Sequence, residues 1–321
     1  MRGNRIFYAC QGLALDGQLL RGLQSIGTNS DIKTYTNDIF GSIGSYVSQD
    51  SPSVTVSVTK ILGGNDRTIY SGTTTDNIDP TRRKNLCLFI GDEVAGFIGN
   101  TVEYSGRTEP NIISFSGAFI SSAAYSLSTD SNLTESIDFV SYSRSMGSGS
   151  FCGLDIIQQD ATDVLPTLRQ AGLVGGGSEG ISARQHVKST NMSGPGNLTG
   201  FDIQTSFSRQ PVEQFAKGYI DPTYSYVITP VETSLSFTIS AIKSSNYDRL
   251  IDVTMNDCSG DYLNPTYSNN FFVEMCNGIK FNISNCYFQG MTYGGGDTGG
   301  GNVDTTYNYT CYNGFEIENS G

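Results

Sequence analysis

Two stretches in different halves of this sequence carry the same pattern of apolar residues. Residues 113–125 (ISFSGAFISSAAY) align without a gap with residues 281–293 (FNISNCYFQGMTY), and apolar side chains coincide at five positions. Each stretch leads through a polar or glycine-rich loop into a second alternating segment, ESIDFVSY at 135–142 and TTYNYTCY at 305–312. Because self-similarity on this scale indicates a repeated structural unit, these blocks predict an internal duplication.

Shorter blocks recur upstream in the same order. VTVSVTK at 54–60 matches FTISAIK at 237–243, and DIKT at 31–34 matches DIQT at 202–205. In the longer pair, apolar and polar residues alternate with the period of two that a half-buried strand requires. The repeat therefore predicts three parts: a first copy over 1–150, a linker with a helix or turn over 151–178, and a second copy over 179–321.

The composition favours strands over helices. The chain has 38 glycines and no tryptophan, and it is visibly rich in Ser, Thr, Asn and Tyr, which suits short strands joined by many turns. Each copy is also expected to carry one short flanking helix, over 36–44 in the first and over 208–218 in the second, where Ser208, Pro211 and Gly218 stand at the positions of an N-cap, a first turn and a stop. The expected class is all-β with minor α.

The charge balance excludes some partners. The 321 residues include 19 Lys and Arg against 31 Asp and Glu, a net charge of −12. Such an excess repels phosphate, so tight binding of DNA or RNA is not expected. No apolar run approaches the roughly 18 to 20 residues that span a bilayer, so no membrane partner is expected. The apolar stretch near residue 1 is shorter than that of a secretory signal, which argues against export by that route.

No motif indicates catalysis, a metal or a cofactor. His186 is the only histidine, no serine lies in a G-x-S-x-G turn, and none of the seven cysteines forms a C-x-x-C pair. Most cysteines are therefore expected to be free thiols. The glycine run at 175–180 follows a helical pattern rather than a strand, so a loop is the better interpretation than a dinucleotide site. We expect no enzyme activity and no cofactor.

The repeat does supply candidate interface residues. Asp66-Arg67 in the first half is echoed by Asp248-Arg249 in the second, and recurrence at equivalent places favours a structural or subunit-contact role. The polar faces of the two matched strands are further candidates for a subunit or lumen surface; these residues are Thr55, Ser57, Thr59, Thr238 and Ser240. The pattern does not say which face looks inward.

The order of the blocks resembles the major tail tube proteins of long-tailed bacteriophages. The resemblance is carried by GLQSIG at 22–27 followed by VTVSVTKIL, and by residues 207–239 (FSRQPVEQFAKGYIDPTYSYVITPVETSLSFTI) in the second half. It implies a β-sandwich with a flanking helix and a long hairpin, and subunits that close into stacked rings. A tandem chain is similar to the two-domain variants of that family, in which three chains form a pseudo-hexameric ring.

The same resemblance implies a structural virion protein in the phage tail, assembled in the host cytoplasm. Its partners would be further copies of itself, the tape measure, the tail terminator and the baseplate or distal tail protein, with double-stranded DNA passing through without specific binding. An acidic lining suits such a conduit because a basic one would hold phosphate. Tips at 73–84, 99–110 and 294–301 are expected to become ordered when rings stack.

Two other classes remain open from the residues alone. A different virion or cell-surface β-module, such as an adhesin or fibre domain, would form monomers or trimers and no stacked rings. A hydrolase or glycan-binding enzyme on a β-scaffold would need a concave cluster of carboxylates and aromatic residues.

Overall fold

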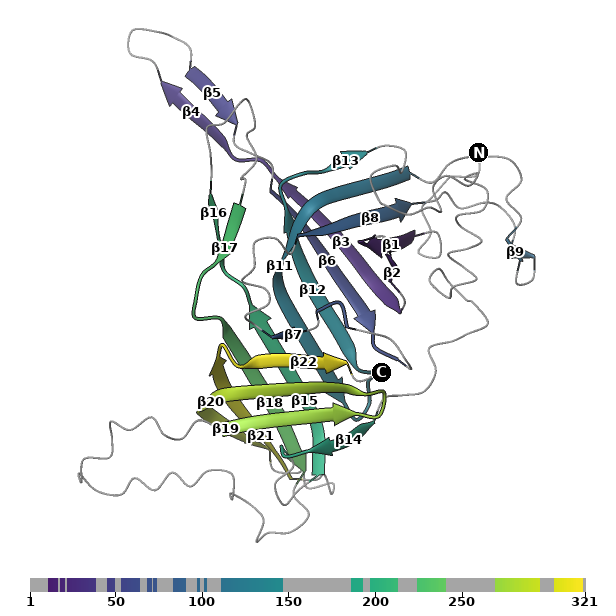
Figure 1. Cartoon of the computed structure of the whole chain (residues 1–321), viewed down its shortest axis with the longest axis vertical. Helices are drawn as coiled ribbons and strands as arrows, with labels where there is room; N and C mark the ends of the chain where they lie inside the picture. Colours follow the sequence, from purple (N-terminus) through teal and green to yellow (C-terminus); the bar gives the residue numbers. More distant parts are fainter. Residues whose placement is uncertain are drawn as a thin grey trace, which may run out of the picture.

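A computed structural model describes residues 11–16, 18–20, 22–38, 45–49, 53–63, 68–70, 72–73, 83–90, 97–98, 101–102, 111–146, 186–192, 197–212, 224–240, 269–294 and 303–319. Every regular element in these ranges is a β-strand, so the all-β class is confirmed (Figure 1). The strands are β1 (Gln11–Leu15), β2 (Gln18–Leu19), β3 (Leu23–Asp31), β4 (Thr34–Asp38), β5 (Ser45–Gln49), β6 (Ser53–Ile61), β7 (Gly72–Thr73), β8 (Lys84–Ile90), β9 (Phe97–Ile98), β10 (Thr101–Val102), β11 (Asn111–Ser128), β12 (Thr134–Ser141), β13 (Ser145–Met146), β14 (Val187–Thr190), β15 (Asn197–Ser206), β16 (Arg209–Val212), β17 (Tyr224–Val227), β18 (Glu232–Ser240), β19 (Asn269–Met275), β20 (Ile279–Gly294), β21 (Asp304–Tyr312) and β22 (Phe315–Asn319).

Most of these strands belong to one large antiparallel sheet, within which two series have matching pairings. In the first half the spatial order is β3-β6-β12-β11-β8-β1, and in the second half it is β15-β18-β21-β20-β19-β14. When the six strands of each series are taken in the order in which they follow along the chain, they occupy the same succession of places in the sheet in both halves. The pairing of β11 with β15 joins the two series into one continuous sheet.

The long strands β11 and β20 agree in backbone detail. The β11–β12 ladder has a bulge between Ile120 and Ser122, and the β20–β21 ladder has one between Phe288 and Gly290. The gap-free alignment of 113–125 with 281–293 places these bulges at the same position. It also aligns Gly117 with Asn285, and both have positive φ angles, 63° and 56°.

The sequence alignment of residues 54–60 with residues 237–243 is four residues away from the correspondence that the strand pairings show. Val54 lies opposite Ser141 in the first half, and Thr233 lies opposite Cys311 in the second. Ser141 and Cys311 are aligned in the blocks 135–142 and 305–312, so Val54 corresponds to Thr233 and not to Phe237. A shift by an even number of residues leaves every side chain on its own face, so the alternating pattern cannot detect it.

The two expected helices are wrong where the structure describes them. Thr36–Asp38 belong to β4, which pairs with β5, and Arg209–Val212 form β16, which pairs with β17. Alternating Thr and Tyr residues favour strand in the first case. Pro211 in the second is compatible with a short two-stranded ribbon, because a strand with one open edge does not need every N–H. Residues 39–44 and 213–218 lie outside the described residues, as does the expected linker at 151–178.

One hydrophobic cluster runs through both series. It includes Val56 and Phe139 of the first half and Phe237 and Phe281 of the second, all at most 1 % exposed. Aromatic rings make the contacts between halves: the ring of Tyr125 on β11 lies 5.1 Å from that of Phe281 on β20. The two halves therefore share a core along the β11–β15 joint.

The expectation of free thiols is also wrong for three of the four described cysteines. Cys286 and Cys311 form a disulfide across the β20–β21 ladder, with a Cα–Cα distance of 4.0 Å, and Cys87 is disulfide-bonded too. Cys276 is free and exposed. Short-range spacing rules miss such a bridge, because the hairpin between β20 and β21 brings together cysteines that are 25 residues apart.

Candidate functional site

A polar surface covers one face of eight consecutive strands, β3-β6-β12-β11-β15-β18-β21-β20. Alternation sends the other side chains of these strands into the core. The strand residues named from the sequence lie on this polar face. Its principal residues are Ser25, Gly27, Asn29, Asp31, Ser53, Thr55, Ser57, Thr59, Thr134, Ser136, Asp138, Ser122, Ala124, Ser126, Asp202, Gln204, Ser206, Glu232, Ser234, Ser236, Thr238, Ser240, Asp304, Thr306, Asn308, Thr310, Gly290 and Thr292.

The charge on this polar face has one sign. Five carboxylates lie on it, from Asp31, Asp138, Asp202, Glu232 and Asp304. No Lys or Arg lies on it in the described parts of β3, β6, β12, β15, β18 and β21, or in β11 and β20 beyond their bulges. Lys280, on the outward side at the start of β20, pairs with Glu318 at 3.7 Å. Partial burial raises the pKa of Asp202 above its ordinary value. A surface of fixed negative charge without cations repels phosphate groups.

Hydroxyl groups bridge the strands of the polar face. Thr59 bonds to Ser136 at 3.2 Å, Ser126 to Thr134 at 2.8 Å, and Thr238 to Thr306 at 2.9 Å. Cross-strand hydroxyl pairs of this kind support the sheet. They also satisfy polar groups internally, which leaves fewer of them directed at a passing ligand.

The eight-strand sheet ends in two open edges. Among the strands that the structure describes, β3 pairs with β6 alone at one end, and the stretch Gly290–Gly294 of β20 pairs with β21 alone at the other. Most of β3 is exposed, and so are Met291 (41 %) and Tyr293 (51 %). Unpaired backbone groups on an exposed edge are a template for another strand.

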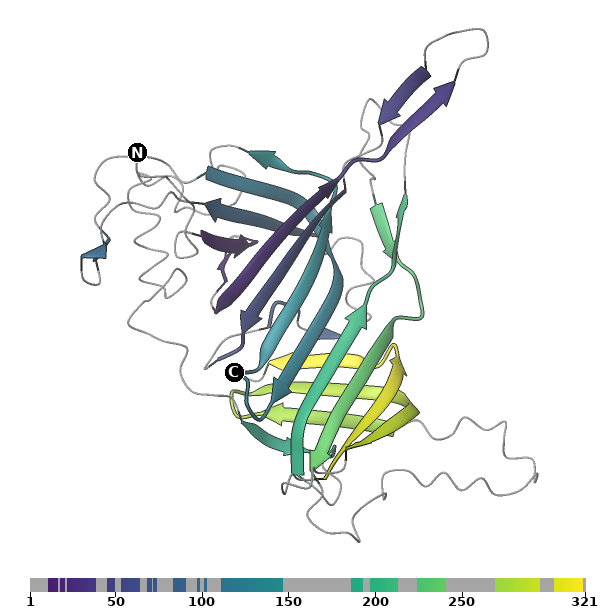
Figure 2. The ribbon, with the colours of Figure 1, turned by 180° about the vertical axis from the view of Figure 1, so that it is seen from behind.

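Two hairpins extend from the same end of the sheet. Figures 1 and 2 show β4–β5 and β16–β17 reaching beyond the body of the molecule. Large apolar side chains are exposed on them or beside them: Ile32, Tyr35, Val47, Tyr226 and Ile228, each about half exposed. Apolar residues gathered on a projecting element mark an interaction surface.

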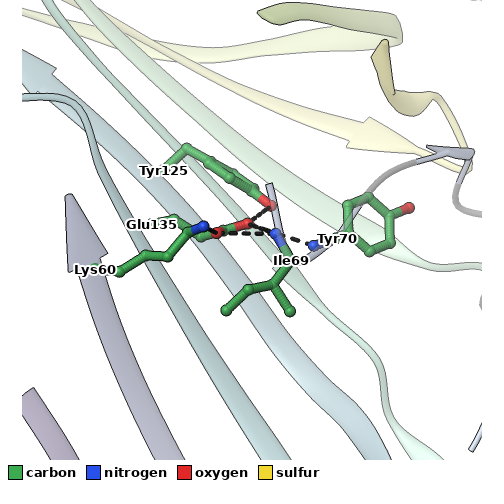
Figure 3. Close-up of polar contacts among 5 residues, drawn as sticks. All are labelled: Lys60, Ile69, Tyr70, Tyr125 and Glu135. Atoms are coloured by element: carbon green, nitrogen blue, oxygen red, sulfur yellow. Dashed lines mark hydrogen bonds and ion pairs between the residues drawn. The ribbon is translucent and has the colours of Figure 1, made fainter. Parts of the chain in front are cut away.

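A buried ionic cluster lies beneath the sheet, centred on Glu135 of β12 (Figure 3). The Tyr125 hydroxyl donates to its carboxylate at 2.7 Å, the Ile69 backbone N–H donates at 2.9 Å, and the Lys60 ammonium lies 3.6 Å away. Burial raises the pKa of Glu135, although Lys60 and the hydrogen bonds act in the opposite direction. Burial, followed by the charge of Glu135, raises the pKa of Tyr125.

This cluster holds a segment that crosses between the halves. Directly after the Ile69 contact, the Tyr70 ring packs at 5.8 Å from both Phe207 and Phe315, and β7 pairs with β22. The segment begins in the first half and ends as an added strand of the second. Glu135 therefore anchors a clamp that joins the two series.

The sequence reasoning missed this cluster, although a signal was present. Glu135 is in phase with the apolar Ile137 and Phe139, and Lys60 is in phase with Val56 and Val58. A charged residue at a core position of an alternating strand is a candidate for a buried ion pair. The four residues Asp66, Arg67, Asp248 and Arg249 lie outside the described residues.

A hollow lies in the part of the chain that the structure describes. It has a volume of about 450 Å³, lies beside the β11–β15 joint, and includes His186, Leu127 and Phe201 in its lining. Its other lining residues are apolar, hydroxyl-bearing or glycine. No group of three His, Cys, Asp or Glu residues in the described ranges could hold a metal ion.

Within those same ranges, no helix has the length and hydropathy that crossing a bilayer requires. No protein-family model matches this chain, and no curated protein sequence shows significant similarity to it.

Proposed function

We propose that this chain is a structural virion protein that polymerises into stacked pseudo-hexameric rings and forms a phage tail tube. The observation that carries the proposal is the eight-strand sheet, which has an acidic face without cations and two open edges. In this view the chain is a tandem duplication of a tail-tube-like β-sandwich. The matching strand orders and the matching bulges of β11 and β20 support that view.

The dimensions of such a ring follow from the strand count. Three chains with eight strands each would give a closed sheet of roughly 24 strands. At about 4.8 Å between strands and about 40° of tilt, the backbone diameter is near 50 Å. Side chains narrow this bore, which still admits a DNA duplex. Closure also removes both open edges, which would otherwise invite aggregation.

The polar face is the candidate lining of the bore. Its carboxylates repel the phosphates of DNA, and three pairs of its hydroxyl groups are bonded to each other. A passing duplex would find few cations to bind, so transit would not stall. The ring would interact with DNA by exclusion and not by recognition.

The hairpins are the candidate contacts between rings. Both extend from one end of the sheet and expose apolar side chains, which stacking on the next ring would bury. The tape measure, the tail terminator and a baseplate or distal tail protein are the further partners that this function implies.

Electron microscopy of the purified protein tests the proposal. Tubes, or rings about 100 Å across that contain three chains, are expected. Monomers, or trimers that do not close into rings, at high concentration would refute it and favour an adhesin-like or fibre-like module. A matched control is Val47→Asp on hairpin β5, which should leave rings intact but shorten or abolish tubes.

A further inference from the structure

We propose that neighbouring chains are joined by antiparallel pairing of Gly290–Gly294 in β20 of one chain with residues 27–31 in β3 of the next. The inference rests on ring formation and specifies the lateral contact. The register it gives is Gly290 opposite Asp31, Met291 opposite Ser30, Thr292 opposite Asn29, Tyr293 opposite Thr28 and Gly294 opposite Gly27.

The template for this contact is the joint inside the chain. There the second half of β11 pairs with β15, from Ser122 opposite Ser206 to Ser128 opposite Gly200. The corresponding edge of β20 has no partner strand in the described structure, and β3 has none on its outer side. The two edges of one chain are therefore the counterparts of the two strands that pair at the internal β11–β15 joint.

The register follows from two correspondences. Ser122 and Gly290 are the first paired residues after the matching bulges of β11 and β20. Ser206 and Asp31 are the last residues of β15 and β3, and each lies opposite the first residue of the next strand in its series. This correspondence replaces the sequence alignment of 31–34 with 202–205, which is four residues out of register. The pair Ser122–Ser206 therefore translates into the pair Gly290–Asp31.

The exposed fractions of corresponding side chains in β11 and β20 show which edge of a single chain lacks a covering partner. Ala123 and Tyr125 of β11 are 0 % and 1 % exposed, whereas the corresponding Met291 and Tyr293 of β20 are 41 % and 51 % exposed. All four side chains point to the core face of the sheet. In the first half the core face is covered across the joint by the second half.

The partner strands differ in the same way. Ile203 and Thr205 of β15 are buried, whereas the corresponding Thr28 and Ser30 of β3 are exposed. The exposed residues of both edges would thus become buried when a second copy of the chain takes the place that the second half occupies at the internal joint. Asp31 would face a glycine, so no pair of carboxylates would be opposed in the new ladder.

Paired cysteines test the register. Thr292→Cys with Asn29→Cys, and Met291→Cys with Ser30→Cys, should give a ladder of covalent dimers and trimers after mild oxidation of assembled protein. The matched control is Thr292→Cys with Ser25→Cys, which uses the same strands and face but is four residues out of register. Wild-type protein treated in the same way reports cross-linking by the native cysteines.

The outcomes separate this inference from the proposed function. Rings seen by microscopy with no ladder from either in-register pair, or with a stronger ladder from the Ser25 control, would overturn the register while ring formation stands. Failure to form rings at all would count against both proposals.

A second variant avoids dependence on cysteine chemistry. Met291→Asp should abolish rings while leaving the circular dichroism of the folded chain unchanged, because the side chain is exposed before assembly. Met146→Asp on β13 is the control, since Met146 is 67 % exposed but lies away from both edges. Normal rings from Met291→Asp would overturn the inference.

Discussion

Removal of the Glu135 side chain should destabilise the fold more than any single change on the polar face. Glu135 is fully buried and lies 3.6 Å from the ammonium of Lys60, whose side chain is 4 % exposed. Glu135→Ala takes away the carboxylate, the acceptor for the Tyr125 hydroxyl and the acceptor for the Ile69 backbone N–H. The crossing segment that ends in β7 would lose its anchor.

The expected magnitude is set by the ion pair. Breaking a buried ion pair by deleting one partner costs about 3–5 kcal/mol. A buried backbone donor deprived of its acceptor costs about 1–3 kcal/mol, and the two costs overlap in part. We expect Glu135→Ala to lower the free energy of unfolding by about 4–5 kcal/mol, a large fraction of the roughly 5–15 kcal/mol that stabilises a domain.

Urea denaturation followed by circular dichroism measures this cost in unassembled protein, since the chain has no tryptophan to report by fluorescence. Ser136→Ala is the matched control, because Ser136 is the next residue of β12 and points to the polar face. It should cost less than about 1 kcal/mol. A loss below about 1 kcal/mol for Glu135→Ala would refute the role of the cluster as an anchor.

Three further predictions concern other features. Because burial raises the pKa of Glu135, the folded protein binds a proton at this carboxyl more tightly than the unfolded chain does. The stability of the wild type relative to Glu135→Gln should therefore fall as the pH rises from about 4.3 towards the pKa of Glu135 in the folded state. Denaturation at a series of pH values measures this difference. Tyr70→Ala should lower the free energy of unfolding by about 3–5 kcal/mol, because it removes an aromatic side chain that is only 2 % exposed; urea denaturation again measures the loss. Asp202→Lys should fold normally, yet its assembled tubes should retain duplex DNA at low salt and release it as salt is added; co-sedimentation with DNA equal to that of wild type would contradict the exclusion model.

The long hairpin of each half was within reach of the sequence. Residues 113–125 and 281–293 align at the positions of a bulge and of a left-handed residue, Gly117 or Asn285, because a backbone irregularity shifts the apolar pattern of the strand that contains it. Uniformly alternating strands contain no such mark. Val54 could therefore be matched with Phe237, four residues from Thr233, which has the equivalent place in the strand pairings, without disturbing either face.

The parts of the site that sequence reasoning missed depend on contacts between distant segments. Lys60, Tyr125 and Glu135 lie on three strands and meet through pairings that no local rule specifies. The cap and stop residues of the segment 208–218 predict a helix. The structure gives Arg209–Val212 a strand partner in β17, and that tertiary pairing outweighs a local helix signal. Thr55, Ser57 and Thr59 were assigned to one face correctly because alternation alone decides it.

Net charge is the weaker part of the case for an acidic conduit, and the placement of the cations is the stronger part. Lys60 points into the core from β6. Lys84 on β8, Lys188 on β14 and Lys280 in the first half of β20 each pair with a carboxylate, of Asp16, Glu274 and Glu318 respectively. None of them occupies the polar face, although the eight strands offer many positions that would accept a lysine. A chain with the same net charge but with cations on this face would hold DNA, so the proposed conduit depends on which face each lysine occupies.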